Sequence, residues 1–387
     1  MTLHIFNPEH DIALASGLSN FTAPHAGRQL RHDLGFLPAI WAHEDDIIVV
    51  DDPEHAAHCW KRLAPKIIST VGADCLAKGS KQFLTWKQLA GLPPLTTGQT
   101  AATGEQPALQ IEPWGWNNAL KALLLRSGLK DSQLPTQPML DTIRLLSHRR
   151  VAASLLPQLR IEGTVGESTE CRSEEEAYDA IRRFGSVILK APWSSSGRGL
   201  RFCDASRLND DGIMTNEKGW LRNILTTQGS VMVEPYYNKV KDFGMEFESD
   251  GEGTVRYLGL SLFHTQNGAY TGNVLATEAA KEEMMSRYLS PTLLQTIRQE
   301  ICQRLGLLFK GKYRGPFGVD MMICASQNEK GDMRSDDCFL LHPCVEINLR
   351  RTMGHVALAL SPNDDNVRRV MRIEYNENVY KLRIQNR

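Results

Sequence analysis

Residues 186–200, SVILKAPWSSSGRGL, end an apolar, strand-like run on Lys190 and continue into a loop of serine, glycine and arginine. A lysine that is buried without a partner is costly, so this position calls for an anionic neighbour or ligand. The loop offers backbone N–H groups and hydroxyls at close range, because glycine permits close approach. The run that follows, LRFCD, is typical of a returning strand. The segment therefore predicts a flap between two antiparallel strands, placed over a bound molecule.

This flap differs from two common nucleotide-binding loops. A P-loop places its glycines before the lysine and a serine or threonine after it, whereas here the glycines follow Lys190. The first strand-like run, LHIFN, is not followed by the GxGxxG spacing of a dinucleotide-binding fold. A surface hairpin would not explain a lysine at the end of an apolar strand, so we favour a ligand-binding flap.

Two later strand-like runs carry polar side chains that suit a hard cation. Side chains alternate faces along a strand, so Glu346, Asn348 and Arg350 share one face of CVEINLR. In GPFGVDMMIC, Asp320 is the lone charge. If the two runs pair, Asp320 and Glu346 converge, because neighbouring strands lie about 4.8 Å apart. Carboxylate and amide oxygens ligate magnesium, and arginine binds phosphoryl oxygens, so we favour a metal and phosphate site over a solvated strand face.

The composition excludes several classes of protein. The 387 residues carry a formal net charge of -1, so there is no global basic field for nucleic acid. The eight cysteines form no CxxC pair and are expected to be free thiols, and the closely spaced Cys338, His342 and Cys344 lack the second half of a zinc site. The N-terminus has no signal-peptide pattern, and no apolar run reaches about 18 residues, so we expect a cytoplasmic protein without a membrane span.

Three regions follow one another along the chain. Residues 1–135 alternate short apolar runs with helical ones, which is typical of an α/β domain with a parallel sheet. Residues 136–230 contain the flap and the helix SEEEAYDAIRRFG, for which Ser173 is the expected cap. Residues 231–387 are rich in antiparallel strand patterns.

The turn FNPEHDIALA, after the first strand-like run, has two interpretations. It places Asn7, Glu9, His10 and Asp11 where a strand leads into a helix, and ligands of open α/β sheets bind at such carboxyl ends of strands. Alternatively, Asp11 caps the helix and has no further role.

The ordered motifs resemble the ATP-grasp superfamily, which includes D-alanine–D-alanine ligase, glutathione synthetase and biotin carboxylase. The resemblance covers residues from about 140 to 355, and it rests on the strand lysine, the Gly-rich flap, VEPYY, the VD strand and EIN in the same order. It implies an α/β N-terminal domain at 1–135 with a parallel sheet, followed by an ATP-grasp fold of two α+β subdomains. These are a lid subdomain at 136–230 and a metal-binding subdomain at 231–387.

The resemblance also implies which residues bind ATP. The nucleotide would lie between the two subdomains, with Lys190 and Arg149 on its α- and β-phosphates, and Arg150 is a rival for Arg149. The other nucleotide-binding residues would be Ser195, Ser196 and Gly197 in the flap, Glu234, Pro235 and Tyr237 at the adenine, and Asp242 at the ribose.

A metal site and a pair of catalytic cations follow from the same resemblance. Two Mg2+ ions would be held by Asp320, Glu346 and Asn348. Arg350 matches an arginine that biotin carboxylase carries two residues after the asparagine, and together with Lys190 it would stabilise negative charge on the reacting groups.

The implied activity is ATP-dependent ligation. A carboxylate of a small molecule or peptide would attack the γ-phosphoryl group of ATP, and an amine or other nucleophile would then displace phosphate from the acyl phosphate. Two alternatives stay open, namely a small-molecule kinase on the same fold and a non-catalytic ATP-binding sensor. The intact set of metal ligands argues against the sensor.

Overall fold

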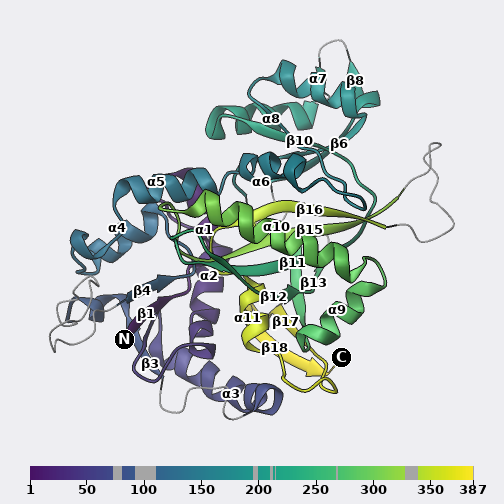
Figure 1. The fold of residues 1–387 in the computed structure, drawn as a ribbon. Helices are drawn as coiled ribbons and strands as arrows, with labels where there is room; N and C mark the ends of the chain where they lie inside the picture. Colours follow the sequence, from purple (N-terminus) through teal and green to yellow (C-terminus); the bar gives the residue numbers. More distant parts are fainter. Residues whose placement is uncertain are drawn as a thin grey trace. The chain divides into compact units, whose positions relative to one another are not determined.

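The computed structural model describes residues 1–72, 81–91, 110–194, 199–209, 212–213, 215–266, 269–326 and 339–386 (Figure 1). The chain forms two compact units, each assembled from separate segments. The boundaries predicted at 135 and 230 stay predictions. The two compact units divide the chain at other positions. Unit 1 contains Met1–Arg144, Thr271–Ala280 and Arg350–Arg387, and unit 2 contains Leu145–Tyr270 and Lys281–Leu349.

Unit 1 begins with the parallel sheet that the sequence predicts. Its strands are arranged in the order β3-β2-β1-β4, and all three neighbouring pairs are parallel. β2, with the sequence IIVV, is buried at every position, as expected of a central parallel strand. The α/β class of the N-terminal region is therefore confirmed. The strands are β1 (Thr2–Ile5), β2 (Ile47–Val50), β3 (Gln82–Thr85) and β4 (Gln110–Pro113).

Several helices of unit 1 begin at a side-chain cap, whereas α1 and α2 do not. The side chain of Asn117 accepts a hydrogen bond from the backbone N–H of Leu120 at 2.9 Å and so starts α4 where the sequence predicts. At α1 the N-cap is Glu9, and Asp11 lies inside the first turn, so the interpretation of Asp11 as a cap is wrong. The helices are α1 (His10–Ser16), α2 (His25–Leu34), η1 (Leu37–Ile40), α3 (Pro53–Val71), η3 (Trp86–Gly91), α4 (Asn118–Arg126), η4 (Asp131–Gln133), α5 (Gln137–Leu146) and α11 (Met353–Ala359).

A second, antiparallel sheet in unit 1 is built from C-terminal strands. β17 (Arg369–Asn376) pairs with β18 (Val379–Asn386) and, on its other side, with residues 272–275 of β14 (Ala269–Leu275). α2 packs against β18. The end of the chain therefore packs with the N-terminal domain, whereas the sequence analysis grouped it with the metal-binding subdomain.

The first sheet of unit 2 carries the segment with the predicted flap. β5 (Thr169–Cys171), β10 (Val231–Pro235), β6 (Ser186–Lys190) and β7 (Leu200–Asp204) are antiparallel neighbours in that order. The predicted return strand after Lys190 is therefore confirmed. The strands of this sheet share one hydrophobic core with α7 (Glu174–Phe184) and α8 (Thr215–Gln228). The Ser173 hydroxyl caps α7 by accepting a hydrogen bond from the N–H of Glu176 at 3.1 Å, as predicted.

The second sheet of unit 2 has the order β12-β11-β15-β16, and α10 packs against β11 and β12 (Figure 1). The described part of unit 2 thus contains two four-stranded antiparallel sheets with helices of their own, in agreement with the predicted pair of α+β subdomains. The main elements are β11 (Lys239–Ser249), β12 (Val255–Ser261), α10 (Pro291–Phe309), β15 (Gly315–Ala325) and β16 (Phe339–Asn348). The others are α6 (Arg150–Leu155), η5 (Leu156–Leu159), η6 (Ala205–Arg207), β8 (Leu208–Asn209), β9 (Gly212–Ile213), β13 (Phe263–Gln266) and α9 (Glu278–Ser286).

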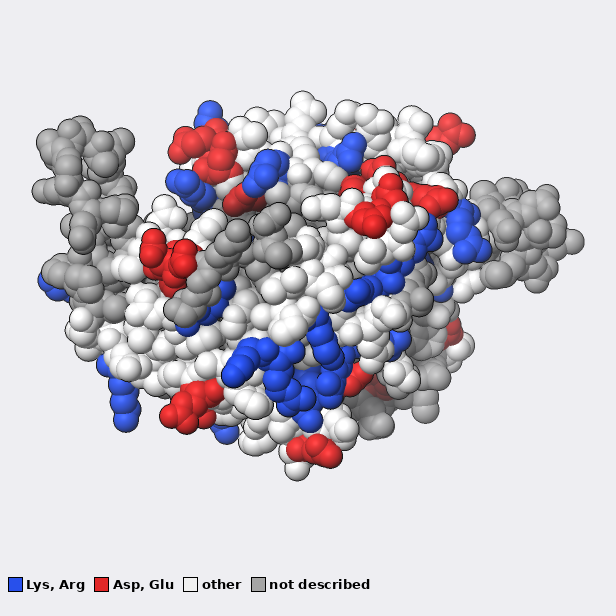
Figure 2. All heavy atoms as spheres, turned by 90° about the horizontal axis from the view of Figure 1, so that it is seen from below, with Lys and Arg blue, Asp and Glu red and all other residues white. Residues whose placement is uncertain are grey.

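Charge is distributed unevenly over the surface. Figure 2 shows an area in which Lys and Arg side chains gather, although the formal net charge of the chain is only -1. The described helices include none that is long and apolar enough to cross a membrane.

Candidate active site

The two strands with the predicted metal ligands are neighbours in unit 2. β15 and β16 run antiparallel, and Asp320 lies directly opposite Glu346. The side-chain amide of Asn348 donates a hydrogen bond to Asp320 Oδ2 at 3.1 Å. On the other face of β15 the apolar side chains are buried, which leaves Asp320 on the polar face. Three oxygen-bearing side chains therefore meet at one place on this sheet.

Arg149 reaches this place from the start of α6. Its side chain is only 7% exposed, and Nη2 donates to Glu346 Oε2 at 2.7 Å. Nη1 donates to the carbonyl oxygen of Ala191 at 2.8 Å and to the Ser194 hydroxyl at 3.0 Å. One guanidinium thus connects the segment after Lys190 with the metal-ligand strand. The side chain of the rival, Arg150, is 39% exposed and does not take part in these contacts.

Lys190 and Glu234 form a buried ion pair. Lys190 ends β6, Glu234 lies near the end of the adjoining β10, and the two residues are 7% and 6% exposed. Mutual attraction offsets the cost of burying both charges only while both are present. Sequence reasoning placed the two residues in one site, but it did not predict this pairing, which depends on the order of the strands.

The thiol of Cys344, on β16, is buried, and nearby charges affect its pKa. Burial raises the pKa of Cys344, and the negative charges of Asp320, Glu234 and Glu346 raise it further, whereas Lys190 lowers it. The cation predicted from the flap segment and the carboxylates predicted from the two later strands therefore act on a single side chain of β16.

His342, also on β16, is a polar residue of this region that sequence reasoning considered only as a zinc ligand. It is 0% exposed, and neither ring nitrogen has a hydrogen-bond partner among the described residues. Its ring meets that of Tyr237 edge to face, with centroids 5.5 Å apart. Buried polar groups are ordinarily hydrogen-bonded, so this imidazole suits a bound ligand that supplies the partner. The available signal was one histidine within the apolar run FLLHPCV.

Replacing His342 by leucine is expected to weaken the acid sensitivity of the fold. Burial lowers the pKa of His342 to about 4, from an ordinary value of 6.5. Between these pH values the unfolded chain binds a proton that the folded chain excludes, so stability falls as the pH falls, by about 3 kcal/mol at pH 4. Urea unfolding of both proteins from pH 7.5 to 4 measures this loss.

The wild-type chain contains an internal reference for this experiment. His10 is buried in unit 1, and burial likewise lowers its pKa to about 4. The His342→Leu variant should therefore keep the loss of stability at low pH that His10 causes, and it should lack the part that His342 causes. If stability fell equally steeply with falling pH in both proteins, the lowered pKa of His342 in the folded chain would be contradicted.

The other residues that are predicted to bind the nucleotide lie on or shortly after β10, on β11 and in the flap. Asp242 Oδ2, on β11, accepts hydrogen bonds from Lys239 Nζ at 2.7 Å and from the Thr265 hydroxyl at 3.1 Å. Pro235 ends β10, and burial raises the pKa of Tyr237. Their contacts with a nucleotide stay predictions. The flap residues Ser195, Ser196 and Gly197 lie outside the described residues.

Arg350 does not continue the polar face of β16, because the strand ends at Asn348. It belongs to unit 1, where Nε and Nη2 donate to the two carboxylate oxygens of Asp11 at 2.7 and 2.6 Å. This bidentate pair gives Asp11 a partner and fixes the guanidinium. The prediction that Arg350 shares a strand face with Glu346 and Asn348 is therefore wrong, and its catalytic role stays a prediction.

Unit 1 has a pocket of about 170 Å³ at the carboxyl ends of its parallel strands. Asn7 and Glu9 from the turn after β1 line it, together with Arg28, Arg31 and Arg126. Arg31 Nη1 donates to Glu9 Oε1 at 2.8 Å. Arg31 also donates from Nε to Asp51 Oδ2 at 3.2 Å, so Arg28 and Arg126 are the lining arginines that are not in an ion pair with Glu9. The pocket lies at the position at which open α/β sheets bind ligands.

Comparison with protein-family models and with curated proteins finds no match. Several solved structures resemble the chain. A protein from Archaeoglobus fulgidus assigned to the ATP-grasp superfamily is 12% identical, with 100% of this chain and 99% of that chain covered and a TM-score of 0.47. The biotin carboxylase domain of Hydrogenobacter thermophilus 2-oxoglutarate carboxylase, solved with MgADP and bicarbonate, is 14% identical, with 89% and 72% covered and a TM-score of 0.49. Phosphoribosylamine–glycine ligase from Thermotoga maritima is 13% identical, with 96% and 80% covered and a TM-score of 0.49.

Proposed function

We propose that this chain is an ATP-dependent ligase of the ATP-grasp type. It would activate a substrate carboxylate as an acyl phosphate and transfer the acyl group to an amine or another nucleophile. The observation that carries the proposal is the meeting of buried cations with hard oxygen ligands inside unit 2. Arg149 donates both to Glu346 and to the carbonyl oxygen of Ala191, the residue after Lys190, and Asn348 donates to Asp320.

The donor set fits magnesium. Asp320 and Glu346 supply carboxylate oxygens and Asn348 supplies an amide oxygen, which are the ligand types that Mg2+ prefers. Arg149 Nη2, 2.7 Å from Glu346, and the Asn348 amide, 3.1 Å from Asp320, hold the two carboxylates in place. When bound, magnesium would neutralise charge on the phosphoryl oxygens and polarise them.

The cations fit the phosphates of ATP. Lys190 and Arg149 are both buried, and a guanidinium presents paired N–H groups that match phosphate oxygens. In this proposal they position the triphosphate and stabilise the negative charge that develops as the γ-phosphoryl group is transferred. His342, whose ring nitrogens are buried near the Lys190–Glu234 pair, would give the nucleoside a polar contact.

An assay of ADP release tests the reaction class. The chain is incubated with ATP, magnesium and a panel of carboxylates, with and without an amine. We expect ADP only when a carboxylate and an amine are both present, and we expect a hydroxamate when hydroxylamine replaces the amine. ADP together with one stable phosphorylated product would favour the kinase. ATP binding without ADP in every combination would favour the sensor.

A further inference from the structure

The pocket of unit 1 combines a buried carboxylate with exposed guanidinium groups. Its walls come from the turn after β1, from the loop between α1 and α2, and from α2, η3 and α4. All of these segments belong to Met1–Arg144, so the pocket lies within unit 1. A cavity of roughly 150 Å³ can hold benzene, so a pocket of about 170 Å³ has room for a small organic molecule.

Glu9 has one carboxylate oxygen that a ligand could use. Its side chain is 11% exposed, and Oε1 accepts a hydrogen bond from Arg31 Nη1 at 2.8 Å. Oε2 is buried and has no hydrogen-bond partner among the described residues. Because buried polar atoms are ordinarily hydrogen-bonded, this oxygen suits a ligand that brings an N–H or O–H donor into the pocket.

Arg31 is held in the wall of the pocket by a network of its own. Besides Glu9 it binds Asp51, and its guanidinium lies over the ring of Trp86, 5.9 Å from the ring centroid. Trp86 Nε1 donates to the other oxygen of Asp51 at 2.8 Å. These contacts fix Arg31 and, through it, the carboxylate of Glu9. The charge of Arg31 is therefore already balanced within the protein.

Arg28 and Arg126 supply further positive charge at the pocket. Both line it and both are exposed, whereas Glu9 is largely buried, so the two guanidinium groups lie nearer to solvent than the carboxylate. Arg28 Nη1 donates to the carbonyl oxygen of Ala23 at 2.9 Å, which leaves its other N–H groups for a ligand. Guanidinium groups bind carboxylates through paired N–H donors, so the outer part of the pocket suits a carboxylate.

The two kinds of charge select the class of ligand. A simple anion would be repelled by the carboxylate of Glu9, and a simple cation would be repelled by the arginines. A zwitterion satisfies both, with an ammonium group at the carboxylate and a carboxylate at the guanidinium groups. Phe21, Leu120 and Leu123 also line the pocket and offer apolar surface for a hydrocarbon side chain.

We propose that the pocket of unit 1 binds one free α-amino acid with an apolar side chain. Glu9 Oε2 accepts hydrogen bonds from the ammonium group, and Arg28 and Arg126 bind the carboxylate. The site is built only from residues of unit 1, and binding requires neither ATP nor magnesium. The proposal therefore goes beyond the ligase activity and does not depend on it.

Isothermal titration calorimetry of the full chain with each of the common L-amino acids tests the proposal. We expect one molecule to bind per chain and an apolar amino acid to bind most tightly. That amino acid is then compared with its decarboxylated amine and its deaminated acid, which should each bind at least about tenfold more weakly because a charge-assisted contact is lost. Absence of binding by every amino acid at millimolar concentration would overturn the proposal. Equal binding of the deaminated acid would also overturn it, by indicating a site for simple anions.

Two variants assign the contacts to their side chains. Arg126→Ala should weaken binding of the amino acid by about tenfold without weakening that of the amine, and Glu9→Gln should weaken binding of the amino acid without weakening that of the deaminated acid. Lys130→Ala, which removes an exposed cation shortly after α4 and outside the pocket, is the matched control and should bind like the wild type. Circular dichroism establishes that each variant is folded. Wild-type affinity for the amino acid in both Arg126→Ala and Glu9→Gln would contradict the proposed site.

Discussion

Replacing Glu346 by glutamine is expected to lower the rate of ADP formation by a factor on the order of 10²–10³. Glutamine keeps an oxygen for the hydrogen bond from Arg149 but removes the negative charge that would hold magnesium. Some loss of thermal stability is expected as well, because the buried Arg149 keeps its hydrogen bond but loses the charge of its partner. A coupled assay of ADP release at several magnesium concentrations measures the effect.

Glu248→Gln is the matched control for this variant. Glu248 lies on β11 of the same sheet and pairs with the exposed Arg256, so its loss should leave turnover unchanged. If Glu346→Gln turned over ATP at the wild-type rate, the assignment of Glu346 as a metal ligand would be wrong, whatever the stability of the variant.

Replacing Lys190 by methionine is expected to destabilise the chain by about 3–5 kcal/mol and to abolish turnover. The reason for the loss of stability is that Glu234 would remain buried with its charge no longer paired. The double variant Lys190→Met, Glu234→Gln removes both charges and should recover most of the stability, but it should not recover activity. Urea unfolding and the ADP assay, applied to both variants, separate the two roles.

The matched control is Lys239→Met, which breaks an ion pair with Asp242 at a largely exposed position. Exposed pairs contribute only about 0–1 kcal/mol, so this variant should unfold close to the wild type. Equal stability of the single Lys190 variant and the double variant would mean that the buried pair is not coupled energetically.

Local features were predictable from the sequence because their causes are local. Ser173 and Asn117 cap helices at the expected positions, since a short polar side chain before a helical run satisfies free N–H groups. The alternation of side chains along two strands placed Asp320 opposite Glu346 once the strands were paired. The parallel N-terminal sheet followed from its pattern of short, fully apolar runs.

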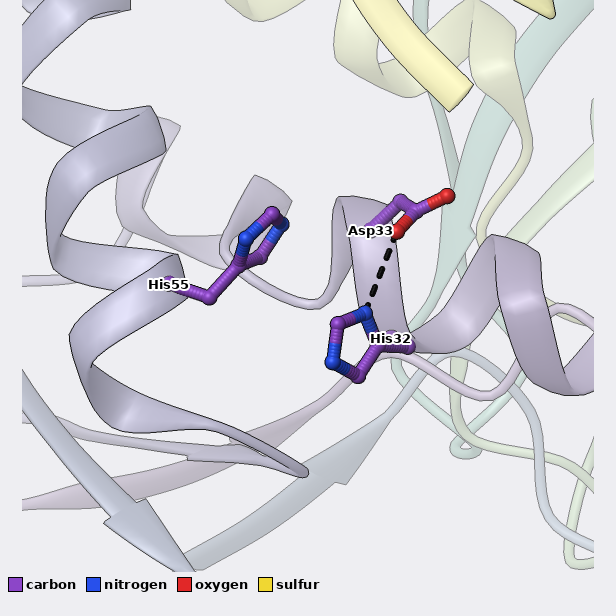
Figure 3. Close-up of side chains that lie close together, drawn as sticks. All are labelled: His32, Asp33 and His55. Carbon is purple, nitrogen blue, oxygen red and sulfur yellow. Dashed lines mark hydrogen bonds and ion pairs between the residues drawn. The ribbon is translucent and has the colours of Figure 1, made fainter. Parts of the chain in front are cut away.

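Long-range partners were not predictable in this way. Arg350 binds Asp11 across almost the whole length of the chain, and no local pattern shows that β16 stops two residues before it. The Lys190–Glu234 pair depends on β6 and β10 becoming neighbours. Figure 3 shows a further example, in which His32 and Asp33 of α2 lie close to His55 of α3 only because the two helices pack together.

The discontinuous make-up of the two units has a consequence for folding. The chain passes from one unit to the other after Arg144, Tyr270, Ala280 and Leu349, so unit 1 combines segments that are far apart in the sequence. One of its long-range contacts joins α2 to β18, where the N–H of Tyr380 donates to Asp33 Oδ2 at 2.8 Å. Because contacts so distant in sequence are slow to form, we expect these contacts of unit 1 to form later in folding than the local hydrogen bonds of its helices.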